Sequence, residues 1–180
     1  MLKNLAQPET VNLQHFDYVV VGSGFGSGFF LSKLLETTSG RILVIERGDY
    51  NAHAWQVSEN RNSPIDRSTT YHSDSDKPWN FTIGFGGGTN CWFAQSPRFL
   101  PNDFQLKSKY GVGQDWPLSY EELEPYYCDA ETIMSVSGDP DMNTVAPRSK
   151  PFPQPPHHPS TPDQTMKTAR PDTHFIIPTA

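Results

Sequence analysis

The feature that most constrains the fold is a glycine-rich turn near the amino terminus. The run Gly22-Ser23-Gly24-Phe25-Gly26-Ser27-Gly28 follows an apolar stretch and precedes a second one. Glycines there let the backbone turn sharply and leave the first amides of a following helix uncovered. Free amides and the helix dipole together attract an anion. Between a strand and a helix, such a turn indicates a site for the diphosphate of a dinucleotide.

The residues on both sides of the turn supply that context. Residues 18–21 and 42–45 are short runs rich in β-branched side chains, which favour strands. Between them, the stretch Phe29, Phe30, Lys33, Leu34 and Leu35 has apolar residues near i, i+1, i+4 and i+5, which favours a helix. The pattern predicts a β-α-β unit over residues 16–48. Continuous apolar strands are typical of a parallel sheet with helices on both faces, so we expect a Rossmann-like α/β domain.

The glycines and a later acid have distinct expected roles. Gly22 permits the tight turn, Gly24 lets the backbone approach a pyrophosphate, and Ser27 replaces the usual third glycine while staying small. Glu46 ends the second strand, where an acid accepts hydrogen bonds from an adenosine ribose. The structural alternative is a plain strand–helix connection followed by a solvated strand end, which the joint occurrence of the two features disfavours.

The remainder of the chain predicts fewer regular elements. Residues 49–81 are polar and without period, which indicates a long surface excursion. Ser119 and Glu122 fit a capping box for a helix that ends near Met134. Residues 145–162 are rich in proline, which favours extended backbone. A short helix is expected from Thr161 and Pro162, and residues 175–177 are expected to begin a strand whose sheet partners lie elsewhere.

Composition narrows the function classes. A chain of 180 residues is long enough for one domain, and its net charge of -6 with scattered basic residues argues against nucleic acid as a partner. No apolar run is long enough to span a bilayer and the first residues lack a signal core, so a cytoplasmic location is expected. Cys91 and Cys128 have no metal-type spacing, and we predict no metal site.

Several motifs in order carry a resemblance to a known family. The segment from Gly86 to Phe99, GGGTNCWFAQSPRF, is followed by Tyr110-Gly111-Val112-Gly113, by Asp115-Trp116-Pro117 and by Glu124-Pro125-Tyr126-Tyr127. Together they resemble the glucose-methanol-choline oxidoreductases, in the branch of bacterial sugar dehydrogenases and pyranose-oxidase-like enzymes. The resemblance covers the chain from about Phe16 to its end. It implies an amino-terminal extension (1–15), part of an FAD-binding domain (16–144) and a proline-rich connection to the next element (145–180).

The resemblance also implies a cofactor and its neighbours. FAD would lie against both glycine-rich segments, and side chains at Gly87 and Gly88 would collide with it. Trp92 would pack near the isoalloxazine or fill core, and Arg98 is an anion contact or an internal salt-bridge partner. Some relatives attach FAD through a histidine at the position of Cys91, where we expect an unmodified thiol rather than a cysteinyl link. The expected cofactor-binding residues are Gly22, Ser23, Gly24, Phe25, Gly26, Ser27, Glu46, Arg47, Gly87, Gly88, Thr89, Asn90 and Trp92.

Catalysis requires a group that the motifs do not supply. In the family a late histidine takes the hydroxyl proton while hydride leaves for the flavin, and none of the six histidines here lies in a matching motif. We therefore predict no catalytic residue in this chain, and expect a truncated or split chain or a subunit completed by a carboxy-terminal partner chain. The complete enzyme would oxidise a CH–OH group of a sugar or alcohol. The alternatives are a non-catalytic nucleotide-binding or interaction module and, less favoured, an NAD-dependent dehydrogenase.

Overall fold

The computed structural model describes residues 5–77 and 81–180, which form two compact units, residues 1–92 and 93–180. They are called unit 1 and unit 2. This division falls inside the predicted FAD-binding range of 16–144, whose boundaries stay predictions. The first four residues of the predicted amino-terminal extension lie outside the described part.

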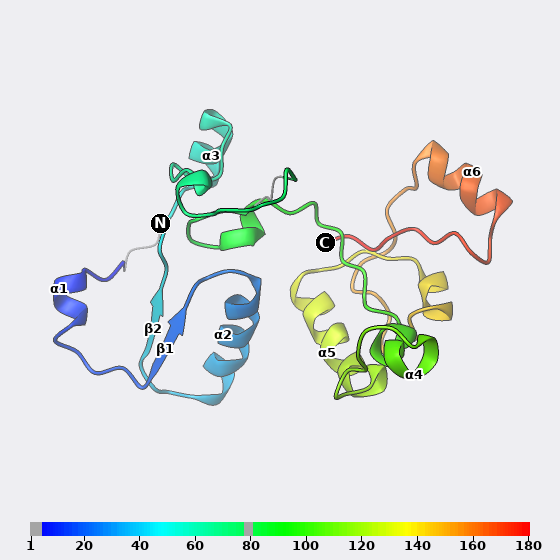
Figure 1. The fold of residues 1–180 in the computed structure, drawn as a ribbon, viewed down its shortest axis with the longest axis horizontal. Helices are drawn as coiled ribbons and strands as arrows, with labels where there is room; N and C mark the ends of the chain where they lie inside the picture. The colour runs from blue at the N-terminus through cyan, green and yellow to red at the C-terminus, as the bar shows by residue number, and fades with distance from the viewer. Residues whose placement is uncertain (1–4, 78–80) are drawn as a thin grey trace. The chain divides into compact units, whose positions relative to one another are not determined.

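Unit 1 contains the predicted β-α-β unit. Strand β1 (Tyr18–Val21) leads through the glycine turn into helix α2 (Phe25–Thr37), and strand β2 (Ile42–Ile45) returns parallel to β1. Tyr18 pairs with Ile42 and Val21 with Ile45, so the two strands match residue for residue. Figure 1 shows them side by side with α2 next to β1. The prediction of these three elements is confirmed, and the described fold is mixed helix with a small parallel sheet.

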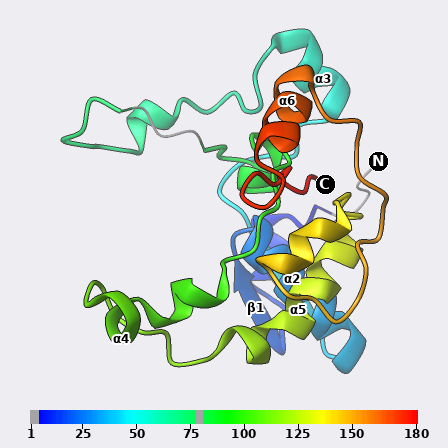
Figure 2. The same ribbon diagram turned by 90° about the vertical axis from the view of Figure 1, so that its right-hand side faces the viewer.

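The rest of unit 1 is mostly loop. Helix α1 (Pro8–Val11) precedes β1, and the 3-10 helix η2 (Gly87–Asn90) occupies the second glycine-rich segment. The predicted surface excursion over residues 49–81 contains two short helical elements that its lack of period did not indicate, α3 (His53–Glu59) and the 3-10 helix η1 (Arg67–Thr69), and its residues 78–80 lie outside the described part. Seven residues are two turns, too few for a helical period to stand out among polar residues. The loop after α3 projects away from the sheet (Figure 2).

The sheet of unit 1 has an uncovered face. Because paired residues point to the same side, Val19, Val21 and Ile45 share one face, and they are 56%, 78% and 47% exposed. Helices on both faces were expected, and among the described residues of unit 1 helix α2 lies next to β1 (Figure 1). Apolar strand residues in water gain none of the burial free energy of a parallel sheet.

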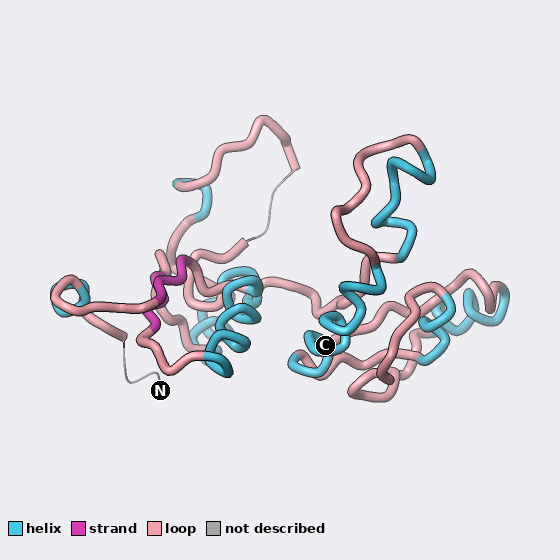
Figure 3. The backbone as a smooth tube through the Cα atoms, turned by 90° about the horizontal axis from the view of Figure 1, so that it is seen from below, coloured by secondary structure: helices cyan, strands magenta, loops and turns pink. Residues whose placement is uncertain are grey.

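Unit 2 is built around one long helix. Helix α5 (Tyr120–Ile133) begins with the predicted capping box, in which Ser119 Oγ accepts from the Glu122 amide and the Glu122 side chain accepts from the Ser119 amide. Its other elements are η3 (Pro101–Gln105), α4 (Leu106–Tyr110), η4 (Pro140–Thr144) and α6 (Thr161–Ala169). Helix α6 is the predicted last helix, capped by Ser160 rather than by Thr161. Element η3 runs directly into α4, and loops connect the other elements (Figure 3).

The strand expected to begin at residues 175–177 has no partner among the described residues, and its pairing with partners elsewhere stays a prediction. The chain there is irregular, and only Thr179 forms isolated bridges, with Gln95 and with Ser137. Pro178 follows the apolar run and has no N–H to donate to a ladder, which limits pairing at this end. Within the described residues, no helix has the length and apolar character needed to cross a membrane. The cytoplasmic location stays a prediction.

Candidate functional site

The two glycine-rich segments, about sixty residues apart in sequence, meet in unit 1. The Gly86 amide donates to Ser23 Oγ at 2.9 Å. A Cβ on Gly87 would lie 3.3 Å from the Gly24 Cα, and Gly87 has φ +50°, a left-handed conformation that favours glycine. Gly87 is thus a glycine for a reason inside the chain, namely its close approach to the first turn. The structure brings both predicted clusters into one place.

Glu46 is fixed at the end of β2 by four hydrogen bonds. Its Oε2 accepts from the amide and the hydroxyl of Ser23, at 3.0 and 2.6 Å, and its Oε1 accepts from the amides of Arg47 and Gly48, at 2.8 and 3.2 Å. Burial raises the pKa of Glu46, but the Ser23 hydroxyl and the three amides together lower it below its usual value. The carboxylate is ionised at neutral pH and points at the glycine turn.

The glycine turn leaves space at its helix end. Gly22 has φ +88°, the left-handed conformation that the predicted tight turn requires, and Ser27 Oγ is 3.8 Å from where its Cβ would be. Gly24 is the N-cap of α2 and has no side chain to bond the amides of the first turn. A Cβ on Gly26 or on Gly88 would meet nothing within 4 Å. The described chain therefore has room for a side chain at both of these positions.

The remaining predicted residues are mostly engaged with the protein. Thr89 Oγ1 donates to the Gly86 carbonyl at 2.8 Å, and Asn90 Nδ2 donates to the carbonyls of Phe85 and Gly87. Trp92 packs edge-on against Phe25, with ring centroids 4.9 Å apart, so it covers the start of α2. Their roles toward a cofactor stay predictions. The Cys91 thiol faces the Gly88 carbonyl and is half-buried.

Sequence reasoning missed a polar groove beside η2. Its volume is about 690 Å³, and it lies between α3 and the segment Thr89–Asn90. Four carboxamides line it, those of Gln56, Asn60, Asn62 and Asn90. Gln56 Nε2 donates to Asn90 Oδ1 at 3.2 Å and so ties α3 to the second glycine-rich segment. The signal that was available is the pair of asparagines that follows Glu59.

In unit 2, Arg98 is an internal salt-bridge partner, one of the two predicted alternatives. Its side chain is buried, and it donates to both Glu131 oxygens at 2.8 Å and to Glu124 Oε1 at 3.2 Å. It also donates to the Tyr120 hydroxyl at 3.2 Å and to Cys128 Sγ at 3.2 Å. Burial lowers the pKa of Arg98, but these partners raise it well above its usual value. The guanidinium is fully used by the protein and has no donor left for an outside anion.

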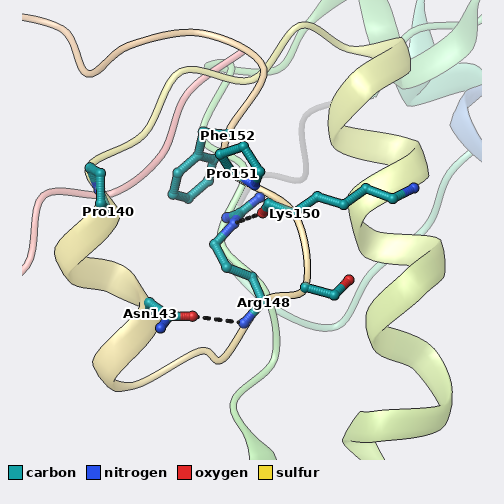
Figure 4. A pocket seen from close by; sticks show the side chains of 7 residues that line it. Pro140, Asn143, Arg148, Lys150, Pro151 and Phe152 are labelled. Carbon is teal, nitrogen blue, oxygen red and sulfur yellow. Dashed lines mark hydrogen bonds between the residues drawn. The ribbon is translucent and has the colours of Figure 1, made fainter.

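A second arginine extends this network to a small surface pocket. Arg148 pairs with Glu131, its amide donates to Asn143 Oδ1 at 2.9 Å, and its Nε donates to the Lys150 carbonyl at 2.6 Å (Figure 4). Its guanidinium lies over the Phe152 ring, 3.4 Å from the centroid. The pocket has a volume of about 250 Å³. Because its cationic groups already have partners in the chain, we read this pocket as structural.

The described fold is mixed helix with a small parallel sheet, and its two glycine-rich segments meet in unit 1. No model of a protein family matches the chain. It is 34% identical over 167 residues to the fructose dehydrogenase large subunit of Gluconobacter japonicus, which covers 76% of this chain and 30% of that protein. It is 28% identical over 144 residues to 2-methyl-1,2-propanediol dehydrogenase of Mycolicibacterium austroafricanum, covering 72% and 26%.

A third relative is an oxidase. The chain is 29% identical over 161 residues to 6'''-hydroxyparomomycin C oxidase of Streptomyces lividus, covering 86% of this chain and 29% of that protein. All three relatives are oxidoreductases by name, which is consistent with the resemblance to glucose-methanol-choline enzymes. The chain spans less than a third of the length of each of these relatives.

Proposed function

We propose that this chain is the FAD-binding part of an oxidoreductase that takes hydride from a CH–OH group of a sugar or alcohol. The observation that carries the proposal is the meeting of the two glycine-rich segments, with Ser23 bonded both to Glu46 and to the Gly86 amide. The names of the relatives, two dehydrogenases and an oxidase with alcohol or sugar substrates, support the class of reaction.

The residues present fit the cofactor. The first-turn amides of α2 would hold the diphosphate, since Gly24 leaves them uncapped and Gly26 leaves the space before them open. Glu46 would accept from the adenosine ribose, but all four of its acceptor sites are used, so a ribose hydroxyl would replace the Ser23 hydroxyl. Bound FAD would supply the hydride acceptor. The chain's own residues bind and orient it.

The complete reaction needs further polypeptide. The proton acceptor is not among the predicted residues of this chain, and the relatives are more than three times the length that matches. We propose that a carboxy-terminal complement, on the same chain or on a partner, supplies it. A non-catalytic nucleotide-binding module is the second candidate, and it is favoured by the fixed, internally bonded side chains of Thr89 and Asn90.

Gly26→Ala and Gly88→Ala test the cofactor proposal directly. Either methyl group fills space that the protein leaves open, so the fold is expected to keep its stability while FAD binding falls at least about tenfold through overlap with the ligand. Gly28→Ala is the matched control, because it also meets nothing within 4 Å but lies beyond the first turn of α2. The measurement is a fluorescence titration with FAD, repeated with NAD.

The titration separates the candidates. Equal FAD affinity in all three variants, or saturation by NAD alone, would contradict the proposal. Bleaching of the bound flavin by a sugar under anaerobic conditions, once the complement is added, distinguishes the enzyme from the binding module.

A further inference from the structure

We propose that the groove between α3 and η2 binds a polyhydroxylated compound, a sugar or a polyol, through side-chain carboxamides. The volume of about 690 Å³ lies within the range of small-molecule sites, about 300–1,000 Å³. Of the described residues that line it, Thr89 and Asn90 are also expected to hold a cofactor and the others are not. The groove is therefore a candidate site next to the cofactor site of unit 1.

The chemistry of the lining selects the class of ligand. A carboxamide both donates and accepts hydrogen bonds, as a sugar hydroxyl does, and Thr89 adds a hydroxyl of the same kind. No carboxylate is among the described residues that line the groove, so it offers little to a metal cation. Val57 is the one aliphatic residue in the described lining, which disfavours an apolar ligand.

An anion fits the groove less well than a neutral ligand. Among the described residues of the lining, the one permanently charged group is that of Arg61, whose guanidinium is 3.6 Å from the Glu59 carboxylate and 5.5 Å from the centroid of the Trp55 ring. Its charge is thus partly offset before any ligand arrives. A phosphate site uses several donors that converge without acceptors among them, whereas every carboxamide here brings a carbonyl oxygen with its amino group.

Two of the carboxamides are free to bind and two hold the groove together. Gln56 and Asn90 bond to each other, which joins the two walls. The side chains of Asn60 and Asn62 make no hydrogen bond within the part of the chain that the structure describes. Asn60 is held at φ 50° by the end of α3, where its amide donates to the Val57 carbonyl. Its position is preset, which reduces the entropy cost of binding.

The choice of a sugar or polyol as ligand rests on the proposed function, in which the substrates are CH–OH donors. Binding in this groove requires neither flavin nor hydride transfer, so the two ideas fail separately. Side-chain amide signals of the full chain in ¹⁵N–¹H spectra report on each carboxamide. Titration with D-fructose or sorbitol, without flavin, is expected to shift the signals of Asn60 and Asn62 in a saturable manner.

Three variants make the test specific. Asn62→Leu removes a donor and an acceptor at similar size, and Asn60→Gly removes a carboxamide while keeping the left-handed backbone; each is expected to weaken sugar binding about tenfold. Asn12→Leu, on an exposed asparagine outside the groove, is expected to leave it unchanged. Unshifted signals of residues outside the groove establish that each variant is folded.

The results of these titrations distinguish between the possible ligands. Equal sugar affinity in all variants, or shifts caused by inorganic phosphate but not by sorbitol, would overturn the proposal. Competition between FAD and sorbitol for the same signals would assign the groove to the cofactor and overturn it as well. Sugar binding without any FAD binding would leave this proposal standing and remove the proposed function.

Discussion

The two units hold their buried residues in different ways. Unit 2 buries Phe104, Tyr120, Cys128, Val136 and Ala146 around a paired arginine, whereas Ile83 is the one hydrophobic residue of unit 1 that is buried among those the structure describes. Unit 1 is instead held at its site by the bonds of Ser23 and Glu46 and by close glycine contacts. The unit that carries the glycine-rich turn is the one whose strands are largely exposed.

The difference in burial indicates how far the stability of each unit depends on a ligand or on further polypeptide. Hydrophobic burial is the main favourable term in folding, so a sheet with an exposed apolar face has little of its own stability. A two-stranded sheet needs further strands or a covering layer to be stable. Unit 1 therefore gains most from a ligand or from additional polypeptide, and unit 2 gains least.

The largest expected effect is the loss of the buried arginine in unit 2. Arg98→Met leaves the Glu124 and Glu131 carboxylates buried with fewer partners, and the free energy of unfolding of unit 2 is expected to fall by about 3–5 kcal/mol. Arg170→Met, at an exposed arginine, is the control. Denaturant unfolding followed by the fluorescence of Trp116, which packs on Phe104, measures both. A fall below about 1 kcal/mol would remove the contrast between the units.

Acid is expected to act on unit 2 through Glu124. Burial raises the pKa of this carboxyl, but bonds from the Cys128 thiol, from Ser149 and from Arg98 lower it from 4.5 to about 2. Because the folded pKa is depressed, the stabilisation is complete above pH 4.5 and is lost as the pH falls toward 2, on the order of 3 kcal/mol in total. Unfolding of Glu124→Gln at a series of pH values should lack this part of the pH dependence. An unchanged slope in that variant would show that other groups control acid unfolding.

A methyl group at Gly48 is expected to disturb unit 1 alone. A Cβ there would lie 2.5 Å from the Ile83 carbonyl oxygen and 2.6 Å from the Gly84 backbone, so Gly48→Ala should cost about 2 kcal/mol by overpacking. Gly28→Ala, with open space around it, is the matched control. Hydrogen exchange of β2 amides measures the effect on unit 1, and unchanged protection in Gly48→Ala would mean that the corner is not tightly packed in solution.

The sequence predicted the parts that short-range physics determines. Residues 18–21 and 42–45 are strands because β-branched runs favour them, and Ser119 with Glu122 caps α5 because both bonds form within four residues. What it did not predict depends on contacts across the chain. The Arg98 network joins residues up to about fifty positions apart, and the bond between Gln56 and Asn90 spans 34 positions. No local pattern encodes such pairs.

The smallest expected effect tests the uncovered sheet face. Val21 is 78% exposed, so Val21→Thr, which keeps the β-branched shape and adds a hydroxyl, should change the free energy of unfolding by less than about 0.5 kcal/mol. Val20→Thr, on the opposite face and half-buried, is the comparison and should cost more. If the carboxy-terminal complement covers the exposed face, Val21→Thr becomes destabilising once the complement is added, because the hydroxyl is then buried without a partner. Equal effects of the two substitutions in the chain alone would mean that this face of the sheet is already covered. The two units would then differ in packing density and not in their need for further polypeptide.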